Sequence, residues 1–272
     1  MKPRLLLTVD LEWFYNGDDK GDVRSFSRMS LDERVAYDGG HMRNSVKRIL
    51  RVLESYGQKI TFFTVAEINE AYPELLELIA CSGHEIGLHT YRHESPTTLQ
   101  EMEADLALCE PFRKQFGVIS FRAPGIKMQE QFYGALSKNG YRYDSSIYGT
   151  TPISRSGVTV YPVSLLPYLR DPADRVPRSL GNALLRDGVP FGSGLFLGMP
   201  RHIIDALIGL FARKYHTPPC LFLHSWQVVQ PTYPLLSKLR NPWMLAYSIE
   251  MQDVFERLAN DYKFLLFREA FQ

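Results

Sequence analysis

The sequence has few cysteines and no long apolar run. Its 272 residues include three cysteines, Cys81, Cys109 and Cys220. They are widely spaced and odd in number, so they match neither a disulfide framework nor a CxxC metal or redox site, and we expect buried free thiols. No stretch reaches the roughly 20 apolar residues that a membrane-spanning helix needs. The sequence therefore predicts neither a disulfide-rich fold nor a transmembrane helix.

The chain also lacks an excess of charge of either sign. Its net charge is +1, with 31 Lys and Arg against 30 Asp and Glu. No basic face points to nucleic acid, and no polybasic segment points to anionic lipid. The N-terminal "MKPRLLLTVD" has an apolar run too short for a secretory signal. We expect a cytoplasmic protein whose partner is recognised at a specific site.

Hydrophobic residues make up 45% of the chain, enough for a sizeable core, and we predict a single domain over residues 1–272. Short apolar runs alternate with segments of helical period, the pattern of βα units around a parallel sheet. The predicted strands are 4–10, 59–65, 84–89, 118–124, 158–163, 220–226 and 262–269. The predicted helices are 41–56, 72–82, 97–115, 129–139, 200–214 and 248–261.

Two regions, 14–40 and 164–198, interrupt this alternation and are predicted to be long loops, either functional lids or disordered segments. The helix at 200–214 is apolar enough to touch a membrane surface, but its pattern favours buried packing.

The stretch "HEIGLHTYRH" places three of the seven histidines within ten residues. Alternation along the strand puts His84 on one face and His89 on the other, so a structural role is expected for His84. His89 and His93 are four residues apart, a spacing that brings two imidazoles to one side of a helical turn. The spacing alone leaves open a metal site or a simple surface pair, because the glutamate of the zinc-protease motif is missing.

Two carboxylates, Asp10 and Glu12, end the first predicted strand and lie on one side if the chain stays extended. One of them could complete a cation site with two histidines, and the other could take a proton from water. Two acids at an exposed strand end are the simpler alternative.

Arg122 and His224 also follow apolar strands. A guanidinium in such a position needs an anionic partner, and Asp10 is the candidate. His224 could act as a general acid or could be an ordinary core histidine. Because these residues, with Asp10 and His89, end predicted parallel strands, we expect them to converge at one rim of the fold.

In chain order, "TVDLEW", "HEIGLHTYRH", "FRAPG", "GYRYDSS" and "FLHSW" resemble the successive motifs of the polysaccharide deacetylase family (NodB homology, carbohydrate esterase family four). "YPVSLLP", "PFGSGLFLGMP" and "NPW" resemble features of its exopolysaccharide and O-antigen branch. The resemblance implies an α/β fold, a distorted barrel with about seven βα units. It also implies a divalent cation and hydrolysis of an N-acetyl amide on a sugar.

By position, Asp10 matches the family's base, His89 and His93 its metal-binding histidines, Arg122 the arginine that orients the base, and His224 the general acid. The usual aspartate after the base is replaced by Leu11. Branches with an acid one residue later use that acid, so the third metal ligand is assigned to Glu12.

Two further positions are assigned more weakly. Gly125 stands where many members have tyrosine, and its backbone N–H could serve an oxyanion. The element that usually supports the acid histidine is missing, and Trp226 could supply an aromatic wall or only core packing.

The resemblance favours zinc, with cobalt, nickel or iron as alternatives. We expect the substrate to be an N-acetylated sugar or glycan of a cell-surface polysaccharide pathway, linked to a nucleotide or a lipid, with at most peripheral membrane contact. Two alternatives stay open: a deformylase or other amidase acting on a lipid-linked amino sugar, and a catalytically silent glycan-binding protein. The sequence does not define the oligomeric state.

Overall fold

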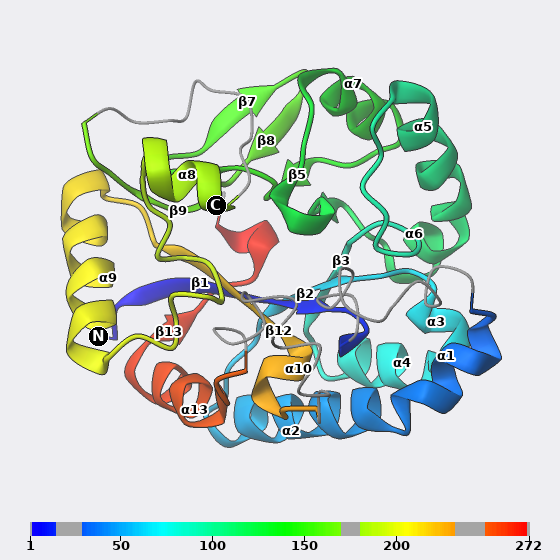
Figure 1. Cartoon of the computed structure of the whole chain (residues 1–272), viewed down its shortest axis with the longest axis horizontal. Helices are drawn as coiled ribbons and strands as arrows, with labels where there is room; N and C mark the ends of the chain where they lie inside the picture. The colour runs from blue at the N-terminus through cyan, green and yellow to red at the C-terminus, as the bar shows by residue number, and fades with distance from the viewer. Residues whose placement is uncertain (1, 15–28, 170–179, 232–247, 271–272) are drawn as a thin grey trace.

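A computed structural model describes residues 2–14, 29–169, 180–231 and 248–270. Strands lie in the middle of the molecule, and helices α9, α13, α2, α4, α5 and α7 surround them (Figure 1). The α/β fold predicted from the alternating pattern is confirmed.

The largest sheet has the strand order β12-β1-β2-β3-β4-β5-β8-β7, and β13 pairs with β1. All neighbours from β12 through β8 are parallel, and β7 is antiparallel to β8. The strands of this sheet are β1 (Arg4–Leu11), β2 (Thr61–Thr64), β3 (Glu85–Leu88), β4 (Ser120–Phe121), β5 (Tyr143–Asp144), β7 (Ile153–Arg155), β8 (Val158–Val160), β12 (Cys220–His224) and β13 (Lys263–Phe264). Two short pairs join β6 (Tyr148–Gly149) to β9 (Val163–Ser164) and β10 (Leu166–Pro167) to β11 (Gly188–Val189).

The sheet curls without closing into a continuous ring of paired strands among the described residues. Gly192 spans the gap between β9 and β12: its N–H donates to the Ser164 carbonyl (2.9 Å), and its carbonyl accepts from the Phe222 N–H (2.8 Å). A Cβ at this position would lie 2.4 Å from the Cys220 carbonyl oxygen and 2.7 Å from the Ser164 nitrogen. Only glycine fits so close to two backbones. The observed architecture is thus the predicted distorted barrel, bridged at one seam by a glycine.

The helices are α1 (Leu31–Asp38), α2 (His41–Ser55), α3 (Ile68–Ala71), α4 (Pro73–Cys81), α5 (Leu99–Leu108), α6 (Glu110–Phe116), α7 (Glu130–Lys138), α8 (Leu180–Arg186), α9 (Arg201–Tyr215), α10 (Ser225–Val228) and α13 (Gln252–Asp261), with 3₁₀ turns η3 (Pro124–Ile126) and η5 (Phe267–Glu269). The predicted helices at 41–56, 72–82, 129–139 and 200–214 match α2, α4, α7 and α9 closely. On α9, the side chains of Ile204, Ile208 and Phe211 are buried. This helix therefore packs against the core, the alternative that its sequence pattern favoured over contact with a membrane surface.

Several predicted boundaries are wrong for local reasons. The helix predicted at 97–115 is two helices, because Pro111 at the start of α6 cannot continue the hydrogen-bond pattern of α5. The strand predicted at 220–226 ends at His224, where the Gln227 side chain accepts the His224 N–H (2.9 Å) and α10 begins. The strand predicted at 262–269 is reduced to β13, followed by η5.

The two predicted long loops also contain regular structure. In 14–40, residues 29–40 include α1, and 15–28 lie outside the described residues. In 164–198, β10, α8 and β11 form, and 170–179 lie outside the described residues. Of the three cysteines, Cys109 and Cys220 are buried free thiols as expected, whereas Cys81 is exposed.

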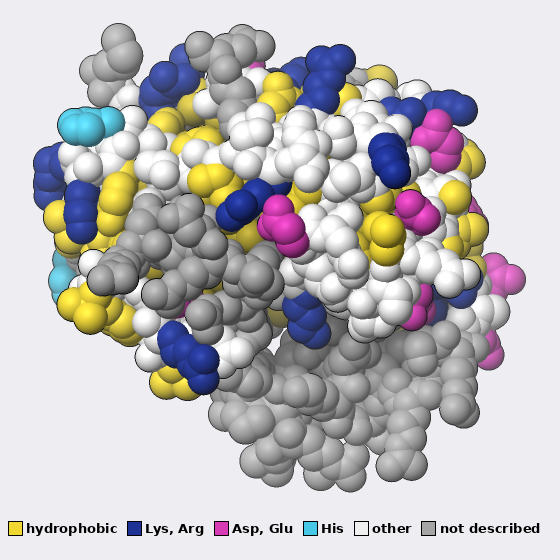
Figure 2. All heavy atoms as spheres, turned by 90° about the horizontal axis from the view of Figure 1, so that it is seen from above, with side chains coloured by type: hydrophobic (Ala, Val, Ile, Leu, Met, Phe, Trp, Pro, Cys, Tyr) yellow, Lys and Arg dark blue, Asp and Glu magenta, His cyan; other side chains and the backbone are white. Residues whose placement is uncertain are grey.

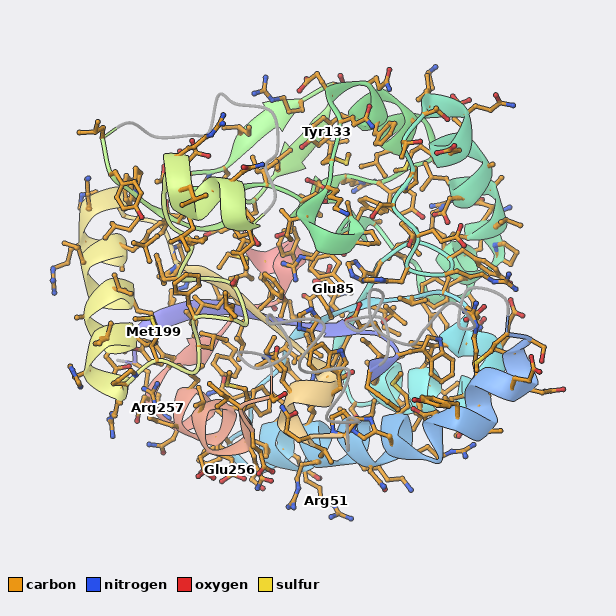
Figure 3. All side chains as sticks on the ribbon, in the orientation of Figure 1. Arg51, Glu85, Tyr133, Met199, Glu256 and Arg257 are labelled. Atoms are coloured by element: carbon orange, nitrogen blue, oxygen red, sulfur yellow. The ribbon has the colours of Figure 1, made fainter. Side chains whose placement is uncertain are left out.

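Alternation along β1 separates the main core from the interior of the barrel. Leu5, Leu7, Val9 and Leu11 belong to the main hydrophobic cluster. The intervening residues face inward and become polar toward the C-terminal end: Leu6 packs with Phe63 and Phe267, whereas Thr8 and Asp10 bond to a polar network. Glu85 on β3 lies in the middle of the molecule on the same inner surface (Figure 3). The polar rim of this interior holds the candidate site.

Among the described residues, no helix has the length and apolar composition needed to cross a membrane. On the face seen in Figure 2, basic and acidic side chains are both present, and the described atoms form no continuous basic patch.

Candidate metal centre and its catalytic surroundings

Glu12, His89 and His93 converge at the C-terminal ends of β1 and β3. Their potential ligand atoms all lie within 4.8 Å of one another. The Glu12 Oε2 atom is 2.5 Å from His93 Nε2 and 3.9 Å from His89 Nε2. Two imidazoles and one carboxylate are the donor set of catalytic zinc sites, which keep a position open for water.

The chemistry of these donors fits a divalent cation. His89 Nδ1–H donates to the Arg122 carbonyl oxygen (2.7 Å), which fixes the tautomer and leaves Nε2 as the ligand atom. Glu12 Oε2 is buried and faces the ring nitrogens of His93 and His89. A buried carboxylate oxygen is costly unless a cation or a proton compensates it.

The protonation states suit metal binding as well. Burial alone would raise the pKa of Glu12, but the neighbouring His93, His224 and His89 outweigh it, and the pKa falls below the ordinary value. Burial lowers the pKa of His89 to about 4. The carboxylate is therefore ionised and the His89 imidazole neutral at pH 7, the forms in which both act as ligands.

The loop that carries His93 differs from the helical turn that the i, i+4 spacing suggested. Thr90 and His93 both have positive φ, 61° and 63°, so residues 90–93 form a tight irregular turn. The loop is held by backbone hydrogen bonds from Ala66 to Thr90 (3.0 Å) and from Glu67 to Tyr91 (3.0 Å). The two rings still meet, with centroids 5.0 Å apart. Left-handed conformations of non-glycine residues are uncommon and concentrate at functional sites.

Arg122 and Asp10 form the predicted ion pair. Arg122 Nη1 donates to Asp10 Oδ1 at 2.7 Å, and both side chains are buried. The guanidinium also donates to Thr8 Oγ1 (2.7 Å), Ser145 Oγ (2.9 Å) and the Ser145 carbonyl (3.2 Å). Its plane is flanked by Phe63 and Phe222, whose ring centroids lie 4.3 and 5.1 Å from Cζ. Every part of Arg122 is therefore fixed, and Asp10 with it.

His224 completes the rim beside Asp10. The two residues are register partners on the parallel strands β1 and β12. His224 Nδ1–H donates to Gln227 Oε1 at 3.0 Å, and its Nε2 lies 3.7 Å from Glu12 Oε1. Gln227 is fully buried and donates to the Gly194 carbonyl (3.2 Å). An amide thus fixes the orientation of the imidazole.

The two weaker assignments have different outcomes. Trp226 is buried, its ring stacks on His224, and its Nε1–H donates to Glu12 Oε1 at 3.0 Å. Gly125 is exposed with φ 61° in η3. Nothing measured in the structure tests its contact with an oxyanion, so that role stays a prediction.

His84, the remaining histidine of the opening motif, is structural as expected. Its Nδ1 accepts the Ile60 N–H (3.3 Å), and its ring packs edge-on against Phe62. Sequence reasoning did not find Gln227 or the role of Ser145. Ser145 lies in the quoted motif "GYRYDSS", but its contact with Arg122 depends on how β4 and β5 pair.

Part of this chain is similar to known proteins. Residues 34–143 match the family described as "Polysaccharide deacetylase". This segment is therefore similar to that family, and the match covers less than half of the chain. It contains His89, His93, Arg122 and Gly125, whereas Asp10, Glu12, His224 and Trp226 lie outside it.

Two curated proteins are similar to part of this chain. A peptidoglycan-N-acetylglucosamine deacetylase of Bacillus cereus is 35% identical over 113 residues, 37% of this chain and 41% of that protein. A peptidoglycan deacetylase-like protein of Gibberella zeae is 32% identical over 114 residues, 39% of this chain and 34% of that protein. The chain thus aligns with about a third to two fifths of the length of these relatives.

A crystal structure assigned to a polysaccharide deacetylase from Mycobacterium smegmatis shares the fold over a larger extent. It has a TM-score of 0.57 and 18% identity, and it covers 94% of this chain and 90% of its own. At this identity the likeness concerns the fold alone.

Proposed function

We propose that this protein is a metal-dependent hydrolase that removes an N-acetyl group from an amino sugar of a glycan. The observation that carries the proposal is the convergence, at one rim, of three metal-ligand side chains, a carboxylate fixed by a buried arginine, and a histidine fixed by a buried amide. The family match over residues 34–143 and the deacetylase names of the similar proteins support the same chemistry.

Glu12, His89 and His93 would hold the cation. A divalent cation bound there would polarise the acetyl carbonyl and lower the pKa of a bound water. Zinc is proposed because imidazole and carboxylate donors suit it, with cobalt, nickel or iron as the other candidates.

The remaining residues supply proton transfer. Asp10, held in place by Arg122, takes the proton of the attacking water. His224 in its protonated form donates from Nε2 to the departing amine nitrogen, because expulsion of an unprotonated amine anion would be very slow. Gln227 keeps Nε2 directed into the site by holding Nδ1. The Gly125 N–H is proposed to stabilise the oxyanion.

The proposed substrate is an N-acetylated precursor of an exopolysaccharide or O-antigen, carried on a nucleotide or a lipid and acted on in the cytoplasm. The motifs that resemble this branch support the proposal. Fractionation of cells that produce the native chain tests the location.

Mass spectrometry of acetylated substrates tests the function. Purified protein loaded with zinc, cobalt, nickel or iron is incubated with N-acetylated nucleotide sugars, lipid-linked glycans and polymers, with and without a chelator. Loss of one acetyl group from at least one substrate class, abolished by the chelator, is expected. A metal-loaded protein that deacetylates no class would contradict the proposal.

A further inference from the structure

Trp226 contacts the candidate metal ligand and the candidate acid at the same time. It lies on α10, directly after β12, and only 1% of its surface is exposed. Its Nε1–H donates to Glu12 Oε1 at 3.0 Å across 214 positions of sequence. Its ring lies parallel to that of His224, with a centroid distance of 4.7 Å and an interplanar angle of 13°.

The hydrogen bond makes the two oxygens of Glu12 inequivalent. Oε1 accepts from the indole, whereas Oε2 faces His93 and His89. An indole N–H is a donor without acceptor capacity, so it can hold a carboxylate oxygen but cannot itself bind a cation. Rotation of the Glu12 carboxylate would break a buried hydrogen bond to a charged group, one of the stronger kinds of hydrogen bond in proteins.

The stacked face of the same indole restricts His224. Parallel stacking at this distance allows the imidazole to slide but opposes tilting out of the shared plane. Gln227 fixes the rotation of the ring within that plane through Nδ1. The N–H edge of the Trp226 indole thus orients Glu12, and the face of the same ring orients His224.

We infer that Trp226 is a positioning residue for the metal centre, which selects Glu12 Oε2 as the ligand atom and aligns His224 with it. The inference rests on the proposed function for the existence of the metal site. It assigns to Trp226 more than core packing, because packing needs neither the N–H nor its direction toward Glu12.

Metal affinity of Trp226→Phe tests the inference. Phenylalanine keeps an aromatic ring against His224 but removes the N–H to Glu12. Zinc affinity, measured by competition with a chromogenic chelator, is expected to fall roughly 10- to 100-fold, the usual effect of removing a partner that orients a metal ligand.

Trp13→Phe is the matched control. Trp13 is also fully buried, and its Nε1–H donates to a carboxylate that is outside the ligand set, Glu67 (3.2 Å). Both variants lose an indole N–H and similar buried area, so both are expected to lower the unfolding temperature, but only Trp226→Phe is expected to weaken zinc binding. If Trp226→Phe does not fold, benzothienylalanine at position 226 keeps the ring size while replacing the N–H by sulfur.

The outcomes separate the inference from the proposed function. If the unmodified protein binds no zinc, cobalt, nickel or iron, the proposed metal site fails. If it binds zinc and Trp226→Phe or the benzothienylalanine protein binds within threefold of it, the role of Trp226 is overturned. Equal weakening by Trp13→Phe would also overturn it, because the effect would then follow from general loss of packing.

Discussion

Arg122 Nη1 lies 2.7 Å from both Asp10 Oδ1 and Thr8 Oγ1, in a side chain that solvent does not reach. Arg122→Lys keeps a positive charge but offers one ammonium in place of a planar group with five N–H donors. The substitution therefore cannot hold Asp10 and Ser145 together. We expect kcat for acetate release to fall by roughly 10²-fold or more, consistent with misplacement of a catalytic group, with a smaller effect on KM.

Arg257→Lys provides the control for this prediction. Arg257 lies on α13 at the periphery of the molecule (Figure 3) and pairs with Asp205 on α9 at 2.7 Å. Its replacement is expected to leave kcat unchanged. Equal activity of the two variants would mean that Arg122 does not orient the base.

Asp10→Asn and His224→Ala test the two proton-transfer roles. Asparagine can still accept from Arg122, so the geometry survives while the base is lost. We expect each substitution to lower kcat by on the order of 10²–10⁴-fold, the range for a positioned general base or acid, with far-ultraviolet circular dichroism unchanged. Near-wild-type turnover in either variant, on a substrate that the unmodified protein deacetylates, would refute that residue's role.

Metal binding is expected to stabilise the folded protein. A ligand at 100 times its Kd adds about 2.7 kcal/mol to the free energy of unfolding if it binds only the folded state. Zinc should raise the midpoint of thermal unfolding of the protein, and a chelator should reverse the rise. His93→Ala should abolish most of it, whereas His202→Ala, which removes an exposed histidine on α9, should keep it in full. A rise that survives in His93→Ala would place the metal elsewhere.

The positions of the main strands could be predicted from the sequence. The site residues that lie at strand ends could be predicted with them. Asp10, His89, Arg122 and His224 all end apolar runs, and parallel pairing brings such ends to one rim. The helix α1 lies in a segment that the polar composition predicts to be a loop. Ser30 and Glu33, three residues apart, form a capping box there, and this spacing is a sequence signal for the start of a helix.

Contacts made by irregular backbone could not be predicted. His89 and His93 meet because Thr90 and His93 adopt positive φ, and non-glycine residues in that conformation leave no pattern in the sequence. The orientation of His224 depends on Gln227 because β12 ends early and α10 follows at once. The pattern of hydrophobic residues does not indicate where a strand ends and a single turn of helix begins.

Asp144 predicts a pH dependence of stability. Burial raises the pKa of this carboxyl to about 7, although Ser146 donates to it through its hydroxyl (2.5 Å) and its N–H (2.9 Å). Because the folded protein holds this proton more tightly than the unfolded chain, the contribution of Asp144 to stability is complete below about pH 4 and is lost as the pH rises to 7.

Asp144→Asn removes this titration. The free energy of unfolding of the variant minus that of the unmodified protein should therefore increase between pH 4 and pH 8, by about 1.4 kcal/mol for each unit that separates the two pKa values. Urea unfolding at a series of pH values measures the difference, in which the other titrating groups cancel. A difference that is constant with pH would show that Asp144 stays ionised in the fold.

Gly192→Ala should damage the seam of the barrel. The new Cβ would meet backbone atoms of β12 and β9 at 2.4 and 2.7 Å, and neither backbone can move without loss of the hydrogen bonds that join the strands through Gly192. We expect destabilisation of at least the 1–3 kcal/mol that is typical of roughly one excess methyl group in a packed core. Gly134→Ala on α7 is the matched control, because its Cβ would meet nothing within 4 Å and alanine is favoured over glycine in a helix by about 1 kcal/mol. The two variants should therefore shift the urea midpoint in opposite directions, and a neutral effect of Gly192→Ala would show that β9 and β12 are not held together there.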